Sequence, residues 1–115
     1  MNLAELIDLE NKINVVDVGA SSITGDGDPP YKPLLDSGIA EVIGFDLNLD
    51  AISELNLRKR KNENYLPYAV YDGKEQELKI CRSGGMTSFL EPNLELLNYF
   101  HGFPEWGKVQ ERLTI

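Results

Sequence analysis

The compact β-branched run Ile13–Val18, which ends directly at Gly19-Ala20, constrains the fold more than any other feature of the chain. Such a run is typical of a strand buried in a parallel sheet. Two similar runs follow at residues 41–46 and 65–71, and segments with helical patterning separate the three runs. This alternation predicts a β-α-β-α-β unit, in which right-handed crossovers connect the strands of a parallel sheet.

Turn and capping signals mark the helices between these strands. Asp28 before Pro29-Pro30 is a suitable N-cap for a helix that runs to about residue 37, because proline has the φ of a first helical turn. Gly38 is a suitable stop for that helix. Either Asn48 or Asp50 caps the next helix, which ends in the basic residues 58–61. A short amphipathic helix is also expected at residues 2–10.

The later part of the chain is less regular. Glu77–Cys81 alternates like a half-exposed strand, and Gly84-Gly85 favours a turn toward residues 86–90, which predicts a β-hairpin. A helix is expected at residues 93–99, and residues 110–115 resemble the start of another strand. We expect one domain over residues 1–115.

Composition excludes several classes of function. The chain has 11 Lys and Arg against 19 Asp and Glu, and the net charge of −8 disfavours nucleic acid as a partner. Its single cysteine, Cys81, has no partner for an internal disulfide, and no Cys/His cluster suggests a metal. No apolar run approaches the roughly 20 residues that span a bilayer, and the start does not resemble a signal peptide. A cytoplasmic setting is therefore expected.

Three motifs follow the ends of the predicted strands, where open α/β sheets bind their ligands. The first is Asp17-Val18-Gly19-Ala20, followed by a polar stretch through Gly25 and Gly27. Glycine at a strand end lets a ligand approach the backbone closely, although a tight turn that needs a positive φ would also explain it. The glycine spacing of the NAD fingerprint is absent.

The second motif places Asp46, with Leu47 after it, at the end of the second strand. A carboxylate at this position can accept hydrogen bonds from both hydroxyl groups of a ribose. A capping role for the next helix is the alternative, but Asn48 and Asp50 already provide caps.

The third motif is Asp72, after the third predicted strand. An acid there can accept a hydrogen bond from the exocyclic amine of adenine. Because Asp72 precedes Gly73, a simple turn explains the residue equally well.

Together these motifs resemble the FkbM-type class I methyltransferases. The similarity lies in residues 15–20, in Gly44-Phe45-Asp46, in residues 66–73, and in residues 87–93, which resemble a serine-rich segment of that family. It implies a Rossmann-like parallel sheet of three or four strands with flanking helices and a β-hairpin insertion, an incomplete class I methyltransferase fold. It also implies S-adenosylmethionine as the cofactor and, for most members, methyl transfer to a hydroxyl group of a sugar or natural product.

The resemblance assigns roles to the motif residues. Asp17 lies near the methionine amino group, Gly19 and Ala20 pass beside the cofactor, Asp46 with Leu47 holds the ribose, and Asp72 lies near the adenine. No catalytic residue is identified. Two departures are an unusually long acidic turn after Gly19 and an aspartate where the family more often has a glutamate at the end of the second strand.

The family's fold normally continues for about as many residues again. We therefore expect either a truncated chain or a homodimer that covers an exposed sheet edge. Two rival functions remain open. An NAD-dependent oxidoreductase would use the same acid after the second strand, and a non-catalytic half-domain would bind a partner or a second copy of itself.

Overall fold

The computed structural model describes residues 11–21 and 27–115. The expected helix at residues 2–10, and Gly25, lie outside the described residues. The chain groups into two compact units, one up to Tyr71 and one from Asp72 onward. The sequence favours one domain over residues 1–115, and each of the two units has a sheet of its own.

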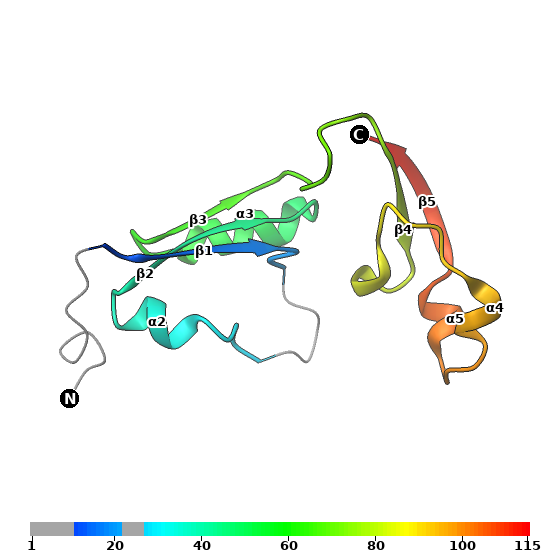
Figure 1. Ribbon diagram of the computed structural model, residues 1–115, viewed down its shortest axis with the longest axis horizontal. Helices are drawn as coiled ribbons and strands as arrows, with labels where there is room; N and C mark the ends of the chain where they lie inside the picture. Colours follow the sequence, from blue (N-terminus) through cyan, green and yellow to red (C-terminus); the bar gives the residue numbers. More distant parts are fainter. Residues whose placement is uncertain (1–10, 22–26) are drawn as a thin grey trace. The chain divides into compact units, whose positions relative to one another are not determined.

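In its described residues, the first unit is a three-stranded parallel sheet with two helices (Figure 1). Its elements are β1 (Ile13–Val18), α2 (Lys32–Asp36), β2 (Ala40–Phe45), α3 (Leu49–Arg58) and β3 (Glu63–Leu66). The spatial order is β1-β2-β3, and the strands pair in parallel throughout. The predicted β-α-β-α-β unit is therefore confirmed, as is an α/β architecture.

Both helices cover the same face of this sheet. Leu35 of α2 and Ile52 of α3 belong to one buried cluster with Ala40, Val42 and Tyr65. Since side chains alternate between the two faces of a strand, residues at the intervening positions lie on the opposite face. There, Val16, Val18 and Ile43 are 65%, 59% and 44% exposed.

The helix boundaries match the capping signals in one case and differ in the other. Asn48 caps α3, and its side-chain oxygen accepts a hydrogen bond from the Ala51 N–H at 3.1 Å. The expected start of α2 at Asp28 is wrong, because α2 begins at Lys32 after Tyr31. A residue before proline is pushed away from helical backbone angles, so the Pro29-Pro30 pair forms a turn before the helix. Gly38 ends this segment with a φ of +75°, as expected.

The third strand lies earlier in the chain than predicted. It covers Glu63–Leu66 rather than residues 65–71, and its last bond to β2 runs from the Asp46 N–H to the Leu66 carbonyl. Pro67 follows directly and has no N–H to continue the ladder. The expectation that Asp72 follows the end of this strand is therefore wrong.

The second unit is built on an antiparallel pair. Its elements are β4 (Glu77–Cys81), the 3₁₀ turn η1 (Gly84–Met86), α4 (Leu94–Leu97), α5 (Phe103–Trp106) and β5 (Val109–Thr114). Strand β4 is as predicted, but its partner is β5, with Leu78 opposite Leu113. The expected partner, residues 86–90, contributes one isolated bridge between Lys79 and Ser88, because Met86 lies in the 3₁₀ turn.

No helix within the described residues is long and apolar enough to cross a membrane.

Candidate functional site

The carboxyl ends of β1 and β2 meet at one edge of the parallel sheet. Val18 stands opposite Phe45 in the ladder, and the N–H groups of Gly19 and Ala20 both donate to the Phe45 carbonyl, at 2.8 and 3.0 Å. Gly19 has a φ of +83°, which explains glycine at this position. A Cβ built on Gly19 would have no atom within 4 Å, so the turn also leaves open space above it.

Asp46 lies directly after β2 and joins the two strand ends. Its Oδ2 accepts hydrogen bonds from the Ser21 hydroxyl at 2.6 Å and the Ser21 N–H at 3.0 Å, and its Oδ1 accepts one from the Asn48 N–H at 2.8 Å. Leu47 is half-buried, and its backbone N–H also faces the carboxylate. Burial acts to raise the pKa of Asp46, but these donors outweigh it and hold the pKa below its ordinary value. The carboxylate is therefore ionised near neutral pH.

A row of side chains on the helix-covered face leads away from this edge. In the strand register, Asp17 of β1 and Tyr65 of β3 flank Gly44 of β2. A Cβ on Gly44 would lie 2.5 Å from Tyr65 Cδ1 and 2.8 Å from Ala20 Cβ. Glycine is required here because the ring of Tyr65 lies across the middle strand.

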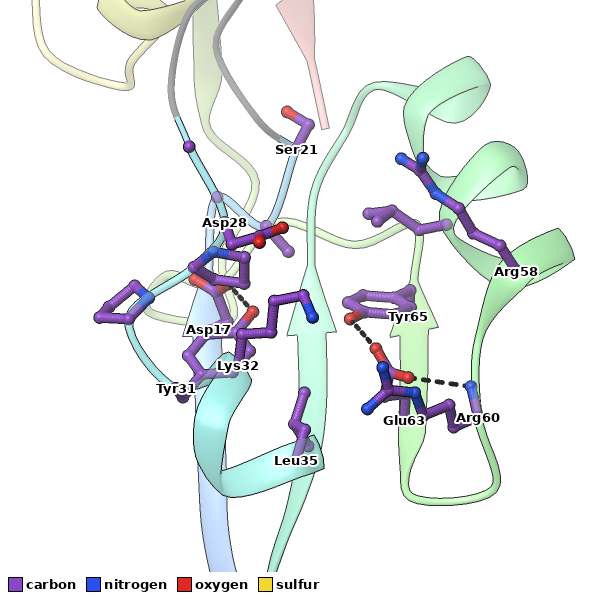
Figure 2. Close-up of a pocket in the computed structure, with 16 residues that line it drawn as sticks. Asp17, Ser21, Asp28, Tyr31, Lys32, Leu35, Arg58, Arg60, Glu63 and Tyr65 are labelled. Carbon is purple, nitrogen blue, oxygen red and sulfur yellow. Dashed lines mark hydrogen bonds between the residues drawn. The ribbon is translucent and has the colours of Figure 1, made fainter. Parts of the chain in front are cut away.

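Two tyrosine–carboxylate pairs line a pocket next to this row, as Figure 2 shows. The Tyr31 hydroxyl donates to Asp17 Oδ2 at 2.5 Å, and the Tyr65 hydroxyl donates to Glu63 Oε1 at 2.9 Å. Burial, together with the neighbouring carboxylates, raises the pKa of both phenols well above its usual value. Both tyrosines therefore act as donors over the physiological pH range.

The rim of this pocket carries both signs of charge. Lys32, Arg58 and Arg60 line it, as do acids that include Asp28. Lys32 and Arg60 both pair with Asp36, which links α2 to the turn after α3. A polar ligand with positive and negative groups would suit such a rim better than a purely anionic one.

The structure brings together most of the residues that the sequence analysis identified, though not all of them. Asp17, Gly19 and Ala20 line the pocket, whereas Asp46 and Leu47 lie at the adjoining strand end. Asp72 belongs to the second unit. Its Oδ1 accepts from the Lys74 N–H at 3.0 Å and its Oδ2 from the Gln76 side chain at 3.4 Å, which agrees with the turn interpretation.

Sequence reasoning missed several residues of this site, among them Ser21, Tyr31, Glu63 and Tyr65. Tyr31 reaches Asp17 through tertiary packing, which no local pattern indicates. Tyr65 lies two residues after Glu63 on the same strand, and this alternation is a local signal that both side chains face the same side. No group of His, Cys, Asp and Glu in the described part of the chain is arranged to hold a metal ion.

No protein-family model, curated protein or solved structure matches this chain.

Proposed function

We propose that the carboxyl edge of the β1-β2-β3 sheet binds the adenosyl group of S-adenosylmethionine, and that the chain is the cofactor-binding part of a methyltransferase. The observation that carries this proposal is the ionised Asp46 carboxylate, which stands at the end of β2 beside the open Gly19 turn. Ligands of open parallel sheets bind at this edge.

The hydrogen bonds of Asp46 indicate how a ribose would bind. Among the described residues, the Ser21 hydroxyl, 2.6 Å from Oδ2, is the side-chain donor to Asp46, and the other donors are backbone N–H groups. A ribose hydroxyl would replace it and donate to the same oxygen, while the backbone N–H groups of Ser21 and Asn48 keep the carboxylate in place. The carboxylate is thus positioned before the ligand arrives, which reduces the cost of binding.

Asp17 would bind the methionine part of the cofactor. Its Oδ2 accepts from Tyr31, so the methionine ammonium would approach Oδ1. Tyr31 fixes the orientation of this carboxylate, and its raised pKa keeps the hydroxyl proton in place.

When bound, the cofactor would supply an electrophilic methyl group on a sulfonium, with S-adenosylhomocysteine as the leaving group. The residues of this chain hold and orient the nucleoside, and positioning of this kind is a large part of catalysis in such displacements. By resemblance, the acceptor is a hydroxyl group of a sugar or natural product.

Calorimetric titration of S-adenosylhomocysteine tests the proposal. We expect saturable binding that Asp46→Asn weakens by about 10- to 100-fold, since a hydrogen bond to a charged group contributes about 1.5–3 kcal/mol. Ser21→Ala should retain or improve the affinity, because it removes the competing donor. Asp50→Asn is the matched control: it removes one charge from the first turn of α3 and should leave the affinity unchanged.

Absence of binding by the folded chain, or binding that Asp46→Asn leaves intact, would overturn the proposal. Thermal unfolding of each variant establishes that the comparison is made between folded proteins.

A further inference from the structure

The outer edge of β1 presents a row of backbone groups that point away from the sheet. The Ile13 N–H donates to the Ile39 carbonyl, just before β2, and the Gly19 N–H donates to the Phe45 carbonyl at the end of β2, each at 2.8 Å. Backbone groups in a strand point to alternate sides, so the odd-numbered positions face β2. The N–H and C=O groups of Asn14, Val16 and Val18 therefore face outward, and no strand within the described residues pairs with them.

Strand β1 lacks the features that normally prevent edges from pairing. It contains no lysine, arginine or proline, and its register with β2 shows no bulge. Its one charged residue, Asp17, lies on the helix-covered face and is bonded to Tyr31. On the opposite face Val16 and Val18 are exposed. A regular apolar edge of this kind is a template for another strand.

We propose that β1 pairs antiparallel with β1 of a second copy of this chain, about a two-fold axis at Val16. The two three-stranded sheets would then form one continuous sheet. The proposal concerns the edge alone and does not depend on any bound cofactor.

The register follows from which backbone groups face outward. With Val16 opposite the partner's Val16, Asn14 stands opposite the partner's Val18, and each outward N–H meets an outward C=O. The backbone groups of all three outward-facing residues then form hydrogen bonds with the partner strand. Side chains of the two Val16 residues meet on the open face of the sheet.

Charge disfavours the neighbouring register. A shift toward the end of the strand would place Asp17 opposite the partner's Asp17, and like charges directly opposite destabilise a sheet. In the proposed register Asp17 stands opposite the partner's Val15. The strand can therefore pair with a second copy of itself without placing like charges opposite each other, and we take a second copy of this chain as the occupant.

Sedimentation equilibrium on the full chain and two edge variants tests this inference. At about 0.15 M ionic strength, where the net charge is screened beyond about 8 Å, the wild type should show a monomer–dimer equilibrium. Val16→Pro should abolish the dimer without removing any bond to β2, because the Val16 N–H points outward. Val16→Lys keeps the N–H and should weaken the dimer by about fivefold or more, by placing like charges across the axis.

Ile43→Lys is the matched control, since Ile43 lies on the same open face but on the middle strand. It should leave edge pairing intact, whereas a dimer formed by stacking two sheet faces would be lost. A monomeric wild type at high concentration, or a dimer that Ile43→Lys disrupts and Val16→Lys does not, would overturn the inference.

A cysteine at Val16 tests the register itself. Paired Cα atoms in an antiparallel ladder lie about 5.5 Å apart, within the range that a disulfide spans. Val16→Cys should therefore form a covalent dimer under mild oxidation, and Ile43→Cys should not. The native Cys81 is only 3% exposed and provides little background. Equal cross-linking of both variants would contradict the register.

Discussion

At the residue scale, the site depends on a few side chains that cross from one strand to the next. Asp46 and Gly19 carry recognisable signals, because acids and glycines after buried strands mark the ligand-binding edge of a parallel sheet. Ser21 and Tyr31 carry none, since they reach Asp46 and Asp17 only when the chain is folded. For Asp72 the sequence leaves ligand binding and a turn equally open, and its carboxylate accepts a hydrogen bond from the Lys74 N–H, as the turn interpretation expects.

Gly44 is predicted to tolerate no side chain. Gly44→Ala would place a Cβ 2.5 Å from the Tyr65 ring, and overpacking of this kind costs about 1–3 kcal/mol. Urea unfolding should show this loss of stability. Gly27→Ala is the control, because a Cβ there meets nothing within 4 Å, and equal stability of the two variants would contradict the packing described.

The half-buried Tyr31 and the buried Tyr65 predict a loss of stability at alkaline pH. The folded state raises the pKa of Tyr31 and Tyr65, whereas unfolded phenols ionise near pH ~10. The two tyrosines therefore contribute fully to the free energy of unfolding below pH ~10, and this contribution is lost as the pH rises above ~10. The free energy of unfolding should fall more steeply above this pH in the wild type than in a Tyr31→Phe/Tyr65→Phe variant; parallel curves would contradict the burial of these hydroxyl groups.

At the scale of elements, hydrophobic runs predict where strands form better than they predict which strands pair with each other. Strand β1 has the predicted bounds, and Asn48 caps α3 as expected. Strand β3 ends early because Pro67 has no N–H to donate to the ladder. This signal is local, so the early end can be predicted from the sequence. The partner of β4 was mispredicted because β5 lies far along the chain, and antiparallel pairing across such a loop leaves no local signature.

The N-cap of α3 is predicted to contribute measurably to stability. Asn48→Ala removes the acceptor for the Ala51 N–H, and loss of such a cap costs about 1 kcal/mol. Ser53→Ala, on the exposed side of the same helix, should be neutral or slightly stabilising because alanine is the better helix former. Urea unfolding of both variants measures the difference, and an unaffected Asn48→Ala would contradict the cap.

At the scale of the whole molecule, the chain is two compact units, and only the first carries the parallel sheet. Alternating β and α signals predict that unit well, because each element there pairs with its neighbour in sequence. The boundary near Tyr71 was not predicted, since no glycine- or serine-rich linker marks it.

The two units are predicted to differ in their response to a core mutation. Leu78 is 5% exposed in β4, and Leu78→Ala should cost about 2–5 kcal/mol. Hydrogen exchange should then show faster exchange in β4 and β5, while β1, β2 and β3 keep their protection. Loss of protection in all five strands would show that the units unfold together.

We propose that the Asp46 carboxylate binds a ribose diol, and a comparison of two ligands tests this binding. S-adenosylhomocysteine and its 2′-deoxy analogue are titrated into the wild type and Asp46→Asn. We expect the variant to lose about 10- to 100-fold in affinity for the first ligand and much less for the analogue, which lacks the 2′-hydroxyl group. An equal loss for both ligands, or no binding of either by the folded chain, would contradict it.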